Sequence, residues 1–142
     1  MKEWVAYSLS DLPHIAKELL NHLGTETKIV CFEAPMGSGK TTFISALLRS
    51  MGIEEIEGSP TYSIVNSYES TFYGEVLHFD LYRLKSFEEA LDIGFEEMIY
   101  SDAYCFIEWA EKVEHILPLP YAKVSISVEN ELRVFRYQSI SN

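Results

Sequence analysis

The sequence is poor in positive charge and in cysteine. Eleven lysines and arginines stand against 22 aspartates and glutamates, so the formal net charge of the 142 residues is −11. A protein that binds a nucleic-acid backbone tightly needs clustered Lys and Arg, so the composition argues against such binding by this chain alone. The two cysteines, Cys31 and Cys105, lie in apolar runs and show no C-x-x-C spacing. We expect buried, reduced thiols, and neither a disulfide nor a cysteine metal site.

Long hydrophobic runs are also absent. No apolar stretch approaches the roughly 20 residues needed to cross a bilayer, and the first residues, Met1 to Trp4, do not resemble a signal peptide. The expectation is a cytoplasmic protein that makes no contact with a membrane. A length of 142 residues suits one domain with a sizeable core, which we take to span residues 1–142.

The clearest functional signal lies in residues 31–42, which read CFEAPMGSGKTT. Gly39, Lys40 and Thr41 fit the end of the pattern G-x-x-x-x-G-K-[ST], and Ala34 stands where the first glycine is usual. Glycines in such a loop let backbone N–H groups point inward at an anion, and the following helix N-terminus adds about half a unit of positive charge. Lys40 would reach the β- and γ-phosphates and the Thr41 hydroxyl would bind Mg²⁺. The alternative, a glycine-rich turn with an incidental lysine, explains fewer of these features.

Hydrophobic periodicity predicts helices alternating with strands. The expected elements, in chain order, are a helix from its N-cap Ser10 to Gly24, a strand at 28–32, a helix at 43–51, strands at 62–68 and 76–81, a helix from Ser86 to Gly94, a strand at 104–107, a short helix at 111–116, and a hairpin of strands 122–128 and 132–137. This order indicates a single-domain α/β protein whose sheet mixes parallel and antiparallel strands and is flanked by helices.

Two carboxylates are candidates for the acid that a phosphate-binding loop requires. Asp80 and Glu108 each end an apolar run, and the carboxyl ends of strands are where α/β folds collect ligand groups. The alternative for either is an acid that simply faces water. Thr61 could reach metal or phosphate from a loop, as a switch threonine does, or could lie in a plain turn. His78 is interpreted as a supporting or core histidine, and Trp109 as core or as a nucleotide contact.

Four motifs occur together in order, and they resemble one family closely. They are Gly37-Ser38-Gly39-Lys40-Thr41-Thr42-Phe43, Ser59-Pro60-Thr61-Tyr62, His78-Phe79-Asp80-Leu81-Tyr82-Arg83-Leu84 and Ile107-Glu108-Trp109. The chain resembles TsaE, the small bacterial ATPase of tRNA threonylcarbamoyladenosine biosynthesis, from about Ser10 to Val134. The resemblance implies a P-loop NTPase fold, Mg²⁺-dependent hydrolysis of ATP, and action beside the partner proteins TsaB and TsaD. Contact with tRNA would then be indirect, through that complex.

The resemblance also assigns roles to residues. The implied catalytic residues are Lys40, Asp80, Glu108 and Thr61; the implied nucleotide-binding residues are Met36, Gly37, Ser38, Gly39, Lys40, Thr41, Thr42 and Trp109, with Ser10 and Arg133 near the base; the implied Mg²⁺ ligands are Thr41, Glu108 and Asp80. Of the two acids, we expect Glu108 to lie closer to the metal, because its strand is wholly apolar and would hold it rigidly. We expect Asp80, flanked by His78, to position the attacking water.

One position departs from the family pattern. Where the family has Gly-Asp-Leu-Gly, this chain has Ala34-Pro35-Met36-Gly37. Pro35 removes one backbone N–H and one acidic side chain, so the role of that aspartate does not carry over. Two other functions therefore stay open: a small-molecule kinase, and a nucleotide-dependent binding module with little hydrolysis. A kinase of this type usually brings several arginines to the phosphoryl group, and only Arg83 lies in a motif here.

Overall fold

A computed structural model describes residues 2–35, 37–57 and 64–142 of the chain. The strands are β1 (Lys2–Ala6), β2 (Ile29–Glu33), β3 (Val65–Ser70), β4 (Gly74–Asp80), β5 (Tyr104–Glu108), β6 (Tyr121–Glu129) and β7 (Leu132–Ile140). The helices are α1 (Leu12–Leu23), α2 (Lys40–Ser50), α3 (Phe87–Asp92) and α4 (Phe95–Ile99), with 3₁₀ turns η1 (Leu9–Asp11), η2 (Ala110–Lys112) and η3 (Glu114–Ile116).

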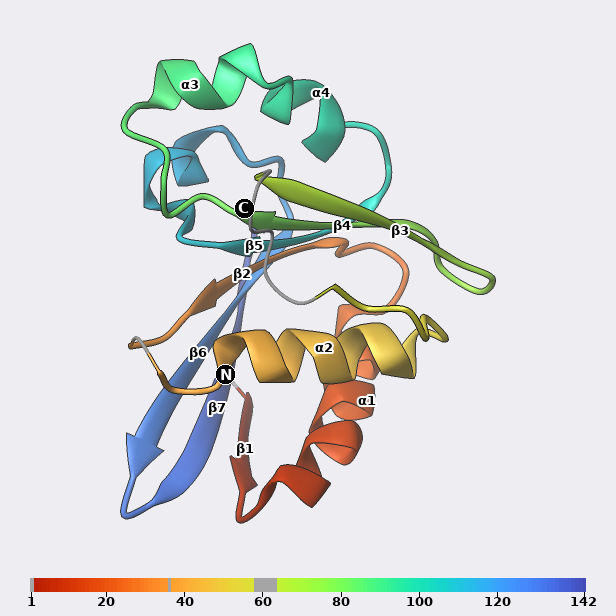
Figure 1. Ribbon diagram of the computed structural model, residues 1–142, viewed down its shortest axis with the longest axis vertical. Helices are drawn as coiled ribbons and strands as arrows, with labels where there is room; N and C mark the ends of the chain where they lie inside the picture. Colours follow the sequence, from red (N-terminus) through yellow and green to blue (C-terminus); the bar gives the residue numbers. More distant parts are fainter. Residues whose placement is uncertain (1, 36, 58–63) are drawn as a thin grey trace.

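The strands form one mixed sheet in the order β1-β7-β6-β2-β5-β4-β3. Strand β2 lies at its centre, parallel to both β5 and β6, and β4 is parallel to β5. The hairpin partners β3 and β7 run antiparallel to their neighbours. Figure 1 shows α1 and α2 on one face of this sheet and α3 and α4 on the other. The expected α/β class, with mixed pairing and flanking helices, is confirmed.

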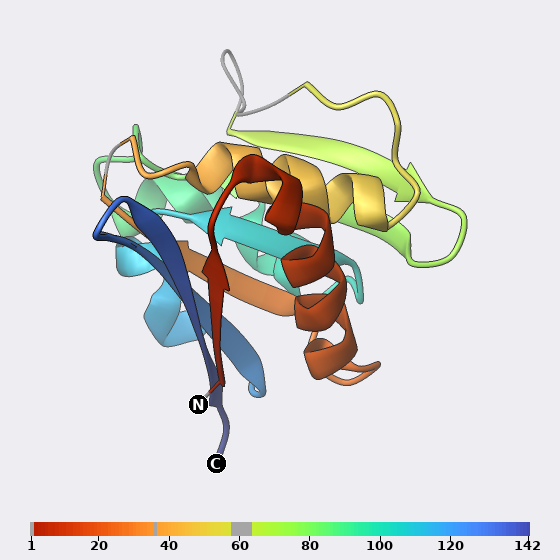
Figure 2. The same ribbon diagram turned by 90° about the horizontal axis from the view of Figure 1, so that it is seen from below.

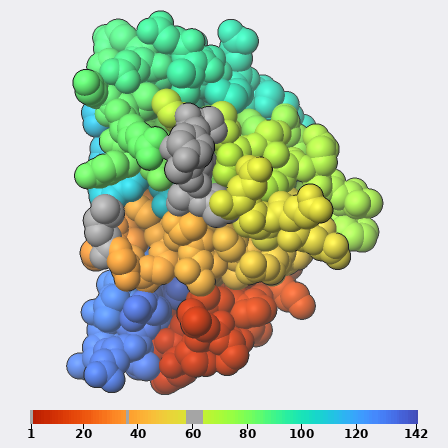
Figure 3. Space-filling model, viewed as in Figure 1, coloured from red at the N-terminus to blue at the C-terminus, as the bar shows by residue number. Residues whose placement is uncertain are grey.

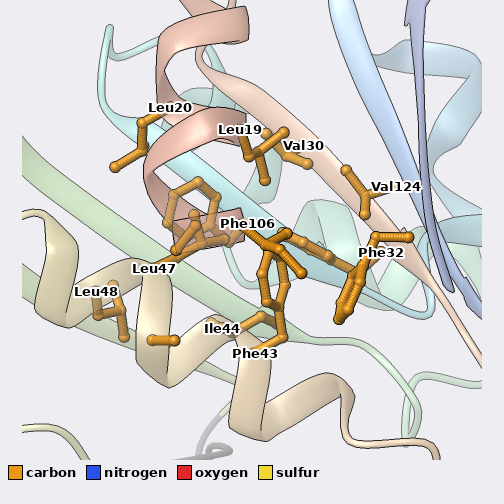
Figure 4. Close-up of a cluster of buried hydrophobic side chains, with 14 of the residues drawn as sticks. Leu19, Leu20, Val30, Phe32, Phe43, Ile44, Leu47, Leu48, Phe106 and Val124 are labelled. Carbon is orange, nitrogen blue, oxygen red and sulfur yellow. The ribbon is translucent and has the colours of Figure 1, made fainter. Parts of the chain in front are cut away.

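The sheet buries apolar side chains on both faces, as a parallel core requires. On the side of α1 and α2, the core is built from aromatic and branched side chains of both helices and of the central strands (Figure 4). Phe32 is its centre, with Phe43 and Phe106 both edge-on at about 6 Å between ring centroids. The side of α3 and α4 holds a second cluster that includes Phe79, Phe95 and both cysteines. Successive residues of β4 and β5 point alternately to the two clusters: Val76 and Phe106 pack in the first, and Phe79 and Ile107 in the second. This alternation fixes the side of the sheet on which each residue of these strands lies.

The N-terminal strand β1 was not expected from the sequence. Its five residues pair antiparallel with β7, Lys2 opposite Tyr137 and Ala6 opposite Arg133. Figure 2 shows β1 beside β7, and in the space-filling view the N- and C-terminal segments adjoin at one end of the molecule (Figure 3). Lys2 and Glu3 are exposed whereas Trp4 and Ala6 are buried, so the strand pattern is too short to stand out in sequence. The pairing with β7 places the residues after Ala6 close to the loop between β2 and α2.

Several element boundaries differ from the expectation. Ser10 does not cap α1: it lies inside η1, and its hydroxyl is 2.7 Å from that of Ser8. The carboxylate of Asp11 instead accepts the N–H groups of Tyr7 and Ser8. Because such short polar side chains satisfy backbone groups in several turns, sequence alone does not choose among neighbouring caps.

Two further helical segments differ from the expectation. The helix predicted from Ser86 to Gly94 is present as α3, with the Ser86 hydroxyl accepting the N–H of Glu89 as its cap, but α4, which begins after Gly94 (φ 81°), was not expected. The predicted helix at 111–116 is two 3₁₀ turns.

Both cysteines are free and buried, as expected. Burial raises the pKa of both thiols, that of Cys105 to about 12, so they remain protonated and unreactive at neutral pH. In the part of the chain that the structure describes, no helix is long and apolar enough to cross a membrane.

Lys123, Glu33, Glu114 and Tyr121 form a polar cluster beside the apolar cluster on the side of α3 and α4. Lys123 of β6 has its ammonium 3.0 Å from a Glu33 oxygen and 3.1 Å from a Glu114 oxygen, and the Tyr121 hydroxyl donates to Glu114 at 2.7 Å. Burial raises the pKa of Glu114, but the hydrogen bond from Tyr121 and the contact with Lys123 lower it below its ordinary value. The ionised carboxylate of Glu114 therefore stabilises the fold.

Glu114→Gln is expected to lower the free energy of unfolding by about 1 kcal/mol at pH 7. Because the folded pKa of Glu114 lies below its ordinary value of 4.5, this stabilisation is complete above that value and is lost as the pH falls through the folded pKa. Urea unfolding at pH 7 and at successively lower pH measures the difference between variant and parent. Glu26→Gln, at an exposed position without an ion pair to any described residue, is the control. A difference that does not shrink in acid would contradict the assignment.

Candidate functional site

The described part of the loop between β2 and α2 turns at two glycines before α2 begins. Gly37 and Gly39 have φ angles of 76° and 95°, in the left-handed region that glycine adopts without strain. The carbonyl of Pro35 accepts both the N–H and the hydroxyl of Ser38, at 3.2 and 2.7 Å. The N–H of Phe43 donates to Gly39 at 2.9 Å, and this bond begins α2. Pro35 is thus accommodated because the loop uses its carbonyl. Met36, an expected nucleotide contact, lies outside the described residues.

Lys40 is the first residue of α2, and its ammonium is held by two groups from β5 and the residue after it. It lies 4.2 Å from the ring centroid of Trp109 and 3.7 Å from a carboxylate oxygen of Glu108. The lysine side chain is only 10% exposed, so the contact with the indole face is a desolvated cation–π interaction. Lys40 is therefore positioned at the mouth of the loop by groups that a phosphate could replace.

Glu108, at the end of β5, is almost completely buried. Its side chain is 3% exposed, and its second carboxylate oxygen is 2.6 Å from Nε2 of His78 on β4. A carboxylate this far from water has to be compensated by a cation and hydrogen bonds, here Lys40 on one oxygen and His78 on the other. His78 itself is fully buried.

Asp80 ends β4 directly opposite Glu108 in the parallel register. One of its oxygens accepts the N–H of Tyr82 at 3.1 Å, and the Tyr82 ring lies 5.0 Å from that of Trp109. His78, expected near Asp80 on β4 as a supporting or core histidine, is buried, and its imidazole bonds Glu108 on the neighbouring strand. Asp80 is less buried than Glu108 and stands nearer the opening.

The loop, Lys40 and the two acids line one hollow of about 460 Å³ at the carboxyl ends of the parallel strands. Thr41 and Thr42 line it too, and the oxygens of Thr41, Asp80 and Glu108 are the kind of ligand that Mg²⁺ takes. Among the described residues, no group of three His, Cys, Asp or Glu side chains could hold a metal by itself. Thr61, the expected switch threonine, lies outside the described residues.

The backbone at Trp109 is unusual. Its φ and ψ are 59° and 55°, a left-handed conformation that a bulky residue adopts only when its surroundings impose it. Such strain costs on the order of 1–3 kcal/mol and concentrates at functional sites. Here the turn follows Glu108 immediately, and it brings the indole under the Lys40 ammonium.

A second hollow of about 330 Å³ adjoins the loop on the side of β7. Arg133 lines it and donates through Nε to the backbone carbonyl of Ser38 at 2.9 Å, which ties β7 to the loop. Ser10 is not among the described residues that line it; its hydrogen-bond partner Ser8 is. Sequence reasoning missed further lining residues, among them Tyr7, Leu9, Glu131 and Phe135. No local motif marks them: Tyr7 and Leu9 follow β1, whose pairing with β7 brings them to the loop, and Glu131 and Phe135 belong to the β6–β7 hairpin.

Comparison with known proteins identifies the family and the fold of this chain. The family model described as "Threonylcarbamoyl adenosine biosynthesis protein TsaE" matches residues 6–136. The tRNA threonylcarbamoyladenosine biosynthesis proteins TsaE of Treponema pallidum and Haemophilus influenzae are 34% and 36% identical, over 78% and 82% of this chain and 80% and 73% of theirs. The crystal structure of Bacillus subtilis YdiB has the same fold, with a TM-score of 0.70 at 22% identity over 99% of this chain and 86% of that one. The chain belongs to the TsaE family.

Proposed function

We propose that this protein is a Mg²⁺-dependent ATPase that supports threonylcarbamoyladenosine modification of tRNA together with TsaB and TsaD. The observation that carries the proposal is the single hollow in which the glycine loop, Lys40, Thr41 and Glu108 meet. Strand–loop–helix geometry, a lysine and a hydroxyl at the helix start, and an acid on the neighbouring parallel strand are the parts that phosphoryl transfer to water requires. Membership of the TsaE family supports the pathway.

Each residue has a distinct task in this mechanism. Backbone N–H groups of the loop and the N-terminus of α2 would bind the phosphates, and Lys40 would leave Glu108 and Trp109 to contact phosphate oxygens. Thr41 and Glu108 would hold Mg²⁺, which supplies charge neutralisation on the phosphates when bound. Asp80, nearer the opening, would orient the attacking water. The base would occupy the hollow beside Arg133.

Membership of the TsaE family supports TsaB and TsaD as partners, and two buried, free cysteines suit a reducing compartment. TsaB and TsaD would carry the tRNA, and this chain would act on the complex in the cytoplasm. A phosphate-release assay with ATP, with and without TsaB and TsaD, tests the proposal against its alternatives. Release that rises with the partners supports the ATPase. Transfer to a small molecule supports a kinase, and tight ATP binding without release supports a binding module.

Lys40→Ala is expected to abolish ATP binding, because it removes charge-assisted contacts worth about 1.5–3 kcal/mol each. Calorimetric titration with ATP measures the affinity. Lys28→Ala is the matched control, since Lys28 lies just before the other end of β2 and pairs with Asp102 at 3.1 Å. ATP affinity that is unchanged in folded Lys40→Ala protein would remove the phosphate-binding assignment.

The two acids are expected to respond differently to neutralisation. Glu108→Gln should raise the Mg²⁺ concentration for half-maximal hydrolysis about tenfold, because it weakens a metal ligand. Asp80→Asn should lower turnover about a hundredfold with little change in ATP affinity. A Mg²⁺ titration of both variants decides between them. If only Asp80→Asn shifts the Mg²⁺ requirement, the two roles are exchanged, and if neither variant changes activity, neither acid belongs to the site.

The purified chain is expected to bind tRNA no more tightly than roughly 10⁻⁶ M at physiological salt, because its net charge of −11 repels the phosphate backbone. Filter binding at two salt concentrations measures this. Tight binding by the single chain that weakens steeply with salt would show that tRNA contacts this protein directly.

A further inference from the structure

His78 is a polar residue in an apolar part of the sheet. It is fully buried on β4, beside Phe106 of β5 in the register, on the face that α1 and α2 cover. Burying an imidazole there is unfavourable unless it is hydrogen-bonded. Nε2 lies 2.6 Å from Glu108, whereas Nδ1 has no hydrogen-bond partner among the described atoms. A histidine that only filled the core would not require an acid, so the contact with Glu108 is the feature to be explained.

Whether His78 Nε2 donates to Glu108 depends on which ring nitrogen carries the proton, and the surroundings of Nδ1 indicate this. A proton on Nδ1 would be a buried donor without an acceptor, which is the costlier of the two possibilities. The geometry therefore favours a neutral ring that carries its proton on Nε2 and donates it to Glu108.

Glu108 contacts Lys40 and His78, and only the contact with Lys40 would be broken when a phosphate binds. The Lys40 ammonium, 3.7 Å from one oxygen, comes from the loop that receives the phosphates. His78 comes from β4, which is paired with a strand on each side, so the ring cannot follow a ligand. When the lysine turns to phosphate, the imidazole is the protein group that still fixes the carboxylate.

We propose that His78 is a positioning residue: its Nε2–H holds one oxygen of Glu108 so that the other faces Lys40 and the Mg²⁺ position. The proposal rests on the proposed function for the identity of the ligand. The bond itself exists without nucleotide. A hydrogen-bonded group behind a ligand fixes its orientation, and its loss typically weakens metal affinity by about 10–100-fold.

Two polar substitutions separate this role from packing. In His78→Gln the amide can reach the place of Nε2 and donate to Glu108, whereas in His78→Asn the amide ends near the place of Nδ1 and falls short. Both variants put an amide in the same buried position, so they share the cost of replacing the ring. We expect His78→Asn to raise the Mg²⁺ concentration for half-maximal ADP binding about tenfold and His78→Gln to restore most of that loss. ADP affinity in EDTA should stay within about twofold of the parent in both variants, because the contacts of the loop with the phosphates remain.

Calorimetric titration with ADP at a series of Mg²⁺ concentrations supplies this measurement. Equal Mg²⁺ requirements for the parent, His78→Gln and His78→Asn would overturn the proposal, as would equal losses in the two variants. Nitrogen NMR of the histidine rings in nucleotide-free protein is the second measurement. A proton on Nε2 of His78 that exchanges faster in Glu108→Ala supports the bond, and a proton on Nδ1 overturns it. Failure of the unaltered chain to bind ADP or ATP would refute the proposed function, while the NMR result would still decide whether His78 holds Glu108.

Discussion

The burial of one carboxylate governs the functional end of this molecule. Glu108 is nearly out of water, and a charge in that position is tolerated only with partners on both oxygens. Lys40 and His78 come from segments far apart in the sequence, so the sheet must hold β2, β5 and β4 in a fixed parallel register. The aromatic core around Phe32 and Phe106 provides that rigidity directly behind the site. The same packing that stabilises the fold therefore fixes the distance between the phosphate-binding loop and its acid.

The strained backbone of Trp109 directly follows Glu108. The left-handed turn at Trp109 puts a bulky residue where glycine would be at ease, and the chain accepts it because the indole then contacts Lys40. The substitution at Pro35 costs less than its chemistry suggests, since the loop bonds Ser38 through the proline carbonyl. Both of these hydrogen bonds end on the carbonyl oxygen of Pro35, so neither needs the N–H that proline lacks.

Sequence reasoning reached the parts of the fold that local pattern specifies. The loop at Gly37 to Lys40, the buried strand before Glu108 and the hairpin at the C-terminus all follow from spacing and turn residues. It missed β1, because that strand is recognisable only by its pairing with β7, more than a hundred residues away. The residues after β1 that line the hollow beside Arg133 were missed for the same reason. Alternation placed His78 and Asp80 on one face of β4 but did not reveal the bond from His78 to Glu108, because it fixes the face of a strand and not which neighbour across the sheet a long side chain reaches.

Charge balance at the site bears on how a nucleotide would enter. The described residues that line the larger hollow include one lysine and two carboxylates, and the lysine already faces Glu108. A bare triphosphate would bring several negative charges to this opening and would have to draw Lys40 away from its acid while Glu108 stayed buried. Arrival together with a divalent cation would remove the conflict, because the cation would offer a counter-charge to the carboxylate when the lysine leaves it. In the proposed role of His78, its bond to Glu108 would keep the carboxylate in place and so couple phosphate binding at the loop to cation binding at the neighbouring strand.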